Sequence, residues 1–99
     1  MPTESAIVAE IMAKLSETCQ DKWFGFKVHG DQYTVNQPDI VGVLCGTAVV
    51  IECKRLGKHA RAGQLAMQRK WAAAGAVVVQ EATCWEDVFR SLTGVWRAI

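Results

Sequence analysis

Two acidic residues and a lysine stand where neighbouring apolar segments begin and end. The segment VVIECKR (49–55) is largely β-branched, yet it carries Glu52 and Lys54 two positions apart. Because alternate side chains of a strand point to the same face, this carboxylate and this ammonium would lie side by side. Buried charge is costly unless it is paired or bound to a metal ion. The pair is therefore a structural ion pair, part of a solvent-facing strand, or the centre of a site.

A third charged residue, Asp39, opens the apolar stretch 39–54. This stretch predicts two strands joined by a tight turn near Cys45-Gly46-Thr47, so Asp39 and the Glu52–Lys54 pair would meet at the end of the hairpin far from the turn. Two carboxylates placed in this way can share one divalent cation, and Mg²⁺ prefers hard oxygen ligands and keeps several waters. Lys54 would then lie beside the ion, where it can orient a water and stabilise charge on a phosphate.

The rest of the chain predicts a sheet and helices that hold these residues. The expected elements are a helix (4–15), a half-buried strand (23–30), a loop (31–38), the hairpin (39–54), a helix (64–74), a strand (76–82) and a last helix. The last helix starts at the capping-box pattern Thr83–Glu86 and runs through Leu92, with a resumption to Ile99 as the alternative. In the first strand the phenylalanines share one face and Lys27 and His29 share the other. The helix at 64–74 can serve as a parallel crossover. The order α-β-β-β-α-β-α predicts an α/β fold with a mixed central sheet flanked by helices.

Two polar side chains fall on otherwise apolar helix faces. At about 100° per residue, Glu4 projects near the middle of the apolar stripe of the first helix. Gln64 lies on the same side of the second helix as Met67 and Trp71. Both are first-turn residues, for which contact with water, or the helix dipole in the case of Glu4, is also a sufficient explanation. Each is either a site residue or a solvated helix start.

Positive charge is concentrated in one window of the chain. No acidic residue occurs between Cys53 and Gln80, a window that holds six of the eleven lysines and arginines, namely Lys54, Arg55, Lys58, Arg61, Arg69 and Lys70. A basic block suits a phosphate backbone, but it also describes a solvated positive face. His59 is expected to contact phosphate or solvent, and His29 either lines the site or is structural.

Length and cysteine usage limit the class of protein. A chain of 99 residues supports one domain, 1–99, with one modest core. No apolar run is long enough to span a bilayer, and the start does not look like a secretory signal. The four cysteines form no C-x-x-C pair and are expected to be buried thiols, which favours an intracellular, reducing setting.

The stretch QPDI…VVIECKR…GQLAMQRKWAAAGAVVV resembles the PD-(D/E)XK nuclease superfamily. Within it, the chain is similar to stand-alone VRR-NUC domains, the virus-type replication and repair nucleases of phages and bacteria. The resemblance implies the restriction-endonuclease-like core. It also implies that Asp39, Glu52 and the backbone carbonyl of Cys53 bind the metal and that Lys54 is the catalytic lysine.

The same resemblance implies further site residues. Glu4 would be the helix-borne acid beside the metal, and Gln64 the supporting glutamine, with Gln68 as the alternative one turn on. Lys27 would be a phosphate contact. Members of the family usually carry a glycine just before Pro-Asp, where this chain has Asn36-Gln37; asparagine tolerates the same left-handed backbone.

The implied activity is a Mg²⁺-dependent DNA endonuclease, with Mn²⁺ as a substitute, that cuts branched DNA as a homodimeric Holliday-junction resolvase in the cytoplasm of a bacterial or phage-infected cell. No groove-reading helix module is visible, so recognition of shape and backbone is expected. A flap or restriction-like nuclease and, from another class, a non-catalytic DNA-binding module are the alternatives. The expected DNA contacts are Lys27, His29, Arg55, Lys58, His59 and Arg61.

Overall fold

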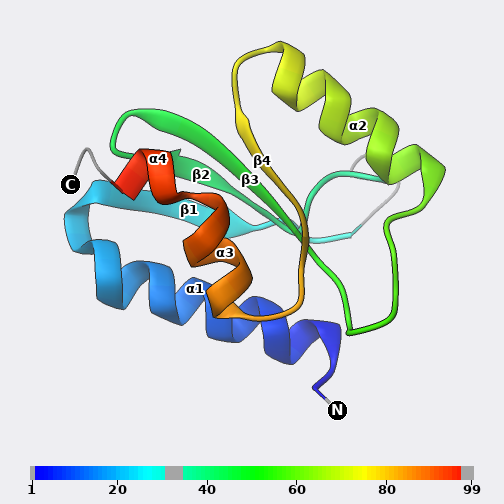
Figure 1. Ribbon diagram of the computed structural model, residues 1–99, viewed down its shortest axis with the longest axis horizontal. Helices are drawn as coiled ribbons and strands as arrows, with labels where there is room; N and C mark the ends of the chain where they lie inside the picture. The colour runs from blue at the N-terminus through cyan, green and yellow to red at the C-terminus, as the bar shows by residue number, and fades with distance from the viewer. Residues whose placement is uncertain (1, 31–34, 97–99) are drawn as a thin grey trace.

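A four-stranded mixed sheet forms the centre of the molecule, with the strands in the order β1-β2-β3-β4 (Figure 1). β1 (Trp23–Lys27), β2 (Ile40–Leu44) and β3 (Thr47–Cys53) are antiparallel neighbours, whereas β4 (Val77–Ala82) runs parallel to β3. The structure is a computed structural model that describes residues 2–30 and 35–96, so part of the predicted loop and the last residues of the predicted C-terminal helix lie outside the described residues. The prediction of an α/β domain with a mixed sheet is confirmed.

Helices lie on both sides of this sheet. α1 (Glu4–Cys19) and α3 (Trp85–Ser91), followed by the short α4 (Thr93–Trp96), lie on one side, and α2 (Ala62–Ala73) stands on the other (Figure 1). A single 3₁₀ turn, η1 (Gln20–Lys22), leads from α1 into β1. Thr3 caps the start of α1, because its hydroxyl accepts a hydrogen bond from the Ala6 N–H at 3.1 Å.

The start of α3 differs from the predicted capping box. The N-cap residue is Cys84, and the Asp87 carboxylate accepts hydrogen bonds from the Thr83 N–H at 2.9 Å and from its hydroxyl at 2.7 Å. The hydrogen bond from the Thr83 hydroxyl lowers the pKa of Asp87 the most, and the hydrogen bond from the Thr83 N–H lowers it further. The prediction that Glu86 completes the box is therefore wrong by one residue, because the helix begins one position later than Thr83 would require.

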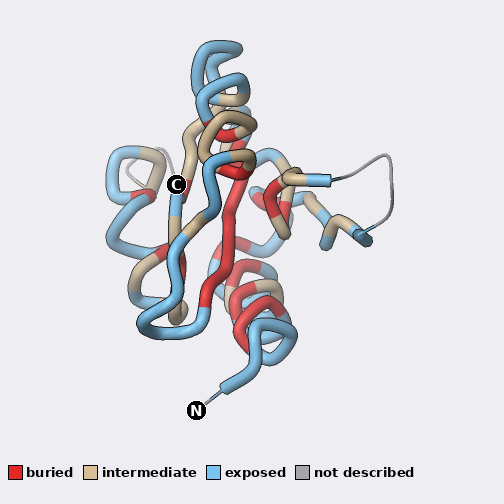
Figure 2. Tube along the Cα trace, turned by 90° about the vertical axis from the view of Figure 1, so that its right-hand side faces the viewer, coloured by how far each residue is buried: buried red, intermediate tan, exposed pale blue. Residues whose placement is uncertain are grey.

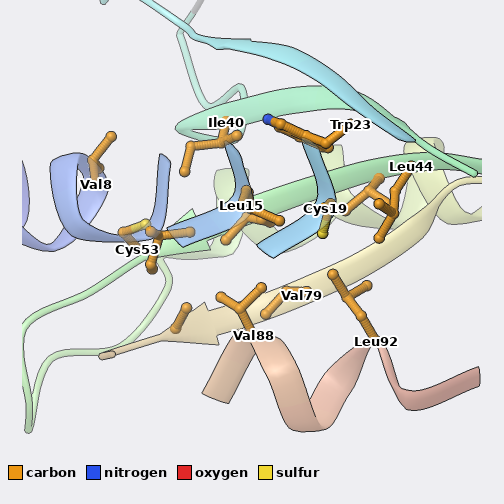
Figure 3. Close-up of a cluster of buried hydrophobic side chains, with 14 of the residues drawn as sticks. Val8, Leu15, Cys19, Trp23, Ile40, Leu44, Cys53, Val79, Val88 and Leu92 are labelled. Carbon is orange, nitrogen blue, oxygen red and sulfur yellow. The ribbon is translucent and has the colours of Figure 1, made fainter. Parts of the chain in front are cut away.

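The hydrophobic core fills the space between the sheet and the helices α1 and α3. Figure 3 shows side chains from these helices and from all four strands pointing into this common space. β3 is the most deeply buried strand, visible as the continuous red segment in the middle of Figure 2. Val49, Ile51 and Cys53 point into this core and are fully buried, as the alternation of the sequence predicts. This rigid central strand ends at the charged residues Glu52 and Lys54.

The hairpin β2–β3 forms as predicted. Cys45 and Gly46 both have positive φ, 51° and 80°, which is the backbone of a two-residue turn that matches the twist of the strands. Ile40 pairs with Ile51, so the residue before β2 lies across from the end of β3.

β1 is half-buried, as the alternation predicts, but its phenylalanine face is the exposed one. Phe24 and Phe26 are 82% and 59% exposed, whereas Trp23 on the opposite face is 6% exposed. The reason is a pair of glycines, Gly25 and Gly42, that lie directly opposite each other in β1 and β2. A Cβ on either would lie 2.5 Å from the Trp23 indole, so the glycines leave the space in which the indole packs flat against the sheet.

Gly42→Ala is expected to lower the free energy of unfolding by roughly 1–3 kcal/mol, because the added methyl would overlap both the Trp23 ring and the Phe24 carbonyl oxygen. Urea unfolding of the variant measures this loss. Gly30→Ala is the matched control, since no atom of residues 2–30 or 35–96 lies within 4 Å of the Cβ it would add. Equal stabilities of the two variants would contradict the packing role of the glycine pair.

Candidate metal centre

Three strand ends meet at the charged residues. The Cys53 N–H donates a hydrogen bond of 2.8 Å to Asp39 Oδ2, which ties the residue before β2 to the last residue of β3. The Lys54 N–H donates to the Ala82 carbonyl oxygen at 2.9 Å, which ties the same point to the end of β4. The predicted meeting of Asp39 with the Glu52–Lys54 segment is therefore present, and the backbone fixes it from two sides.

The Glu52 side chain is buried, with only 2% of the residue exposed. Its Oε1 accepts a hydrogen bond of 3.0 Å from Gln64 Nε2 and lies 3.7 Å from Lys54 Nζ, so the predicted neighbours on one face of the strand do form an ion pair. Its Oε2 is buried and has no hydrogen-bond partner among the described residues. An unpartnered buried carboxylate oxygen is costly, and a bound cation is one of the few groups that would compensate it.

Asp39 and Glu52, the two carboxyls at the strand ends, both have raised pKa values. Burial, with a smaller contribution from the Asp39 carboxylate, raises the pKa of Glu52 from 4.5 to about 8, although the Lys54 ammonium opposes the rise. Burial also raises the pKa of Asp39, while the Cys53 N–H opposes that rise. Burial and the neighbouring negative charge therefore favour the protonated form of Glu52 in the metal-free protein. A divalent cation neutralises both carboxylates at once, so the residues present fit a hard metal ion.

Gln64 has two structural roles. Its Oε1 accepts a hydrogen bond of 2.9 Å from the Arg61 N–H, which caps the start of α2, and its Nε2 donates to Glu52. Gln68, the alternative left open by the sequence, instead donates to the Gln80 carbonyl oxygen on β4 at 3.1 Å. Of the two glutamines, Gln64 is the one that contacts the carboxylate cluster. These glutamines are the buried residues of α2, whereas the predicted stripe partners Met67 and Trp71 are half-buried.

A cavity of about 600 Å³ opens over these residues, and its lining is divided by charge. The acids come from α1 and the hairpin ends, and the cations come from the segment between β3 and α2. The lining residues are Glu4, Asp39, Glu52, Lys54, Arg55, Lys58, His59, Arg61 and Gln64. The site can therefore hold a cation at its acidic side and an anion against its basic side.

Glu4 lines this cavity but lies differently from the prediction. The residue is exposed in the first turn of α1, and the buried stripe of that helix begins only at Ile7, so the buried-face placement is wrong. Within residues 2–30 and 35–96, no three His, Cys, Asp or Glu side chains are gathered as a ligand cluster. Asp39 and Glu52 are thus the assembled pair. Glu4 adds negative charge that raises the pKa of both, a position suited to contact through water.

Two backbone features support the hairpin end. Because the N–H and C=O of one strand residue point to the same side, the Cys53 carbonyl shares the side on which its N–H meets Asp39, as the predicted metal contact requires. Asn36 has a φ of 69°, the left-handed conformation that asparagine tolerates and that the family's usual glycine would adopt easily. A Cβ on Gly63 would lie 2.6 Å from Asn36 Nδ2, so α2 starts in close contact with the loop before Asp39.

Lys27 and His29 are exposed and are not among the residues that line the cavity. Of the two alternatives for His29, lining of the cavity is not observed among the described residues, although the preceding residue, Val28, donates its N–H to the Asp39 carbonyl oxygen at 2.8 Å. Lys27 pairs with Ile40, the neighbour of Asp39, so it lies on the strand next to the site. A contact of either residue with phosphate stays a prediction.

Glu81 lies near the site but belongs to no recognisable sequence motif. The Glu81 carboxylate on β4 accepts a hydrogen bond of 2.6 Å from the Ala60 N–H and lies 3.3 Å from His59 Nδ1. His59 is largely exposed, so the ion pair contributes little, and the backbone hydrogen bond is the stronger tie. Glu81 therefore anchors the basic segment 55–61 to the sheet. The one signal in the sequence is that Glu81 is the first acidic residue after the window 53–80, which holds none.

Glu81→Ala is expected to raise the rate of limited trypsin cleavage after Arg55 and Lys58 about fivefold, because losing one backbone hydrogen bond of ~1 kcal/mol favours local opening. Glu81→Gln keeps an acceptor for the Ala60 N–H and should stay near the wild-type rate. Glu86→Ala, an exposed acid on α3, is the surface control. Equal cleavage of all these proteins would show that Glu81 does not anchor the segment.

Compared with known proteins, the chain matches no family model, and a search of curated proteins finds no match. None of the helices in the described part of the chain is long and apolar enough to cross a membrane.

Proposed function

We propose that this chain is a Mg²⁺-dependent DNA endonuclease of the PD-(D/E)XK type, similar to stand-alone VRR-NUC domains. The observation that carries the proposal is the buried Glu52 carboxylate, whose Oε2 has no partner among the described residues, beside Asp39 and Lys54. The spacing Pro38-Asp39…Glu52-x-Lys54 joins this geometry to the motif of that superfamily. A purely structural ion pair would not need a second, half-buried carboxyl that raises the pKa of the first.

The protein ligands of the proposed metal are Asp39, Glu52 and the Cys53 carbonyl, with Glu4 in contact through water. When bound, Mg²⁺ supplies a Lewis acid for the phosphate and lowers the pKa of a water. Two carboxylates and one carbonyl leave room for the several waters that Mg²⁺ keeps. Gln64 holds the Glu52 carboxylate in one orientation through the 3.0 Å hydrogen bond.

The cations around the cavity suit a phosphodiester substrate. Arg55, Lys58, His59 and Arg61 line the same cavity as the carboxylates, so a backbone phosphate held by these groups would lie against the proposed metal. Lys54 is 8% exposed, and its ammonium, close to Glu52, is available to orient the attacking water and to stabilise the negative charge that develops on the phosphate. The site lies in an open, basic cavity rather than on a groove-reading helix, which favours recognition of backbone and shape.

The proposed substrate is branched DNA, and a four-way junction is the preferred candidate because of the family resemblance. Two copies of the chain would supply two metal centres, one for each nick in a two-fold symmetric junction. A flap or restriction-like nuclease would use the same residues with another DNA geometry.

The deciding experiment is cleavage of a four-way junction, a flap and a plain duplex of the same arm sequences, with Mg²⁺, with Mn²⁺ and with EDTA. We expect metal-dependent cutting that is fastest on the junction. Asp39→Asn keeps an acceptor for the Cys53 N–H but removes the charge, and Glu52→Gln is nearly isosteric, so both should fold and fail to cut. The proposal fails if no branched or flapped DNA is cut with either metal, or if both variants cut like wild type.

The alternative to an enzyme is a DNA-binding module that has the same fold but no catalytic activity. The cations of the cavity support it as well, but it gives no reason for the buried Glu52 carboxylate beside the half-buried Asp39. Titration calorimetry with Mn²⁺ separates the two: a nuclease binds the metal and loses that binding in Glu52→Gln, whereas a binding module shows no metal binding in either protein.

A further inference from the structure

One face of the sheet is exposed beside the candidate metal centre. On this face, Phe24 of β1 lies opposite Val43 of β2, and Phe26 lies opposite Val41. Phe24, Phe26 and Val43 are 82%, 59% and 48% exposed, whereas Val50 on β3, which shares the face, is 1% exposed. We call Phe24, Phe26, Val41 and Val43 the bare β1–β2 face. A contiguous apolar patch of this kind marks an interaction surface.

The carboxylates of the candidate metal centre belong to the same face. The Val28 N–H donates to the Asp39 carbonyl oxygen at 2.8 Å, which continues the β1–β2 register by one more pair on this face. The β2–β3 register, continued by one residue, places Glu52 opposite Asp39. Because two residues of an antiparallel strand span about 7 Å, the row that holds Phe26 and Val41 lies directly beside the row that holds the carboxylates. The bare β1–β2 face therefore extends along the sheet from the proposed metal site.

Cations flank this face. α2, which lies on the same side of the sheet, carries Arg69 and Lys70 and no acidic residue. The Trp71 Nε1–H donates a hydrogen bond of 2.9 Å to Gln37 Oε1, and these two residues line a hollow of about 240 Å³ together with Lys70. Gln37 leads into β2, so Lys70 lies on the flank of α2 nearer the bare β1–β2 face. Lys70 and the basic segment 55–61 can hold the phosphates of a strand whose bases lie on this face.

The size of the bare β1–β2 face suits nucleotide bases better than a protein partner. An aromatic side chain buries about 150–250 Å², so Phe24 and Phe26 together supply roughly 300–500 Å². Each partner in a standard protein interface buries about 800 Å². Two rings that lie two residues apart on one strand instead offer two stacking positions in a line that leads to the metal centre. Stacking of a base on an aromatic ring is independent of sequence, because every base has a π-face.

We infer that the bare β1–β2 face binds unpaired bases of a DNA strand, with Phe26 stacking on the base nearer the metal centre and Phe24 on the next base. The phosphate at the metal centre determines where the strand lies, so the inference rests on the proposed function. The substrate class is then DNA with unpaired nucleotides next to the cut, as in a flap, a splayed arm or the opened centre of a junction. In a plain duplex the bases stack on one another, and freeing one costs its stacking energy.

Fluorescence anisotropy with a labelled oligothymidylate, in EDTA and at low salt, tests the inference. Phe26→Leu is expected to bind this strand about tenfold or more weakly than wild type, because leucine is apolar but has no ring to stack. Phe26→Tyr keeps the ring and should bind like wild type. An abasic strand of the same length, which has the phosphates but no bases, should bind equally to wild type and Phe26→Leu. Phe89→Leu, at a 50% exposed phenylalanine of α3 on the other side of the sheet, is the matched control and should bind oligothymidylate like wild type.

Because the binding assay contains no metal ion, failure of this inference and failure of the proposed function are distinguishable. Equal binding of oligothymidylate by wild type and Phe26→Leu overturns the inference even if wild type cuts a flap with Mg²⁺, and leaves the face to a protein partner. An equal loss of binding to the abasic strand overturns it as well, since the ring would then act without bases. A loss confined to oligothymidylate supports the inference even if no DNA is cut, in which case the nuclease proposal fails and the face is a base-binding surface.

Discussion

Lys54→Met is expected to reduce the single-turnover rate of metal-dependent DNA cleavage by about 10²–10³-fold or more, while leaving metal binding and DNA binding nearly intact. Lys54 is buried to 8% exposure, and its Nζ lies 3.7 Å from Glu52 Oε1 at the carboxylate cluster. Methionine keeps the apolar stem that fills this space and removes only the ammonium. A group that stabilises charge developing in the transition state contributes to the rate and little to ground-state binding.

Lys58→Met provides the matched comparison, since it removes the same charge from the exposed basic segment of the same cavity. We expect weaker DNA binding and a smaller salt dependence, because a phosphate contact is lost, with a nearly unchanged rate at saturating enzyme. Fluorescence anisotropy in Ca²⁺ measures binding, and quenched-flow cleavage in Mg²⁺ measures the rate. If the two variants lose binding and rate in the same proportion, Lys54 is one more phosphate contact and has no special part in the reaction.

The carboxylate cluster could be predicted because local geometry determines it. A two-residue turn at Cys45-Gly46 fixes the register of the hairpin, and the register alone brings the residue before β2 to the end of β3. Asp39, Glu52 and Lys54 therefore meet whatever the rest of the fold does. The left-handed Asn36 is local in the same sense, because asparagine tolerates this backbone.

The face of β1 could not be predicted, since alternation separates two faces but does not say which one is inside. Phe24 and Phe26 are together more apolar than Trp23 and Lys27, so composition favours the wrong face. The glycine pair Gly25–Gly42 decides it by leaving a flat space for the indole, and this pair forms only when β1 and β2 are in register. The role of Glu81 could not be predicted either, because its hydrogen bond with Ala60 joins residues 21 positions apart and forms only in the folded chain.

The second large effect expected is on stability, through the raised pKa of Glu52. In the metal-free protein the stability should fall as the pH rises from about 4.5 to about 8, by up to about 1.4 kcal/mol per pH unit. The folded protein holds the Glu52 proton in this window and the unfolded chain does not, so raising the pH favours unfolding. The Asp39 carboxyl, whose pKa is raised as well, acts in the same direction.

Mg²⁺ should reverse this trend. The metal binds the ionised carboxylates, so it competes with the proton and stabilises the folded protein more at pH 8.5 than at pH 6. Urea unfolding across this range, with EDTA and with Mg²⁺, measures both slopes. Glu52→Gln should lose most of the fall in the metal-free protein and most of the gain from Mg²⁺.

Glu10→Gln, an exposed acid on α1 outside the cavity, is the control and should keep the wild-type slopes. The two halves of the prediction fail separately. A flat profile for metal-free wild type would mean that Glu52 ionises normally despite its burial, and so that water reaches the carboxylate. A steep profile that Mg²⁺ leaves unchanged would mean that Glu52 keeps its proton but does not bind the cation, which would remove the chemical basis for cleavage while leaving the fold as described.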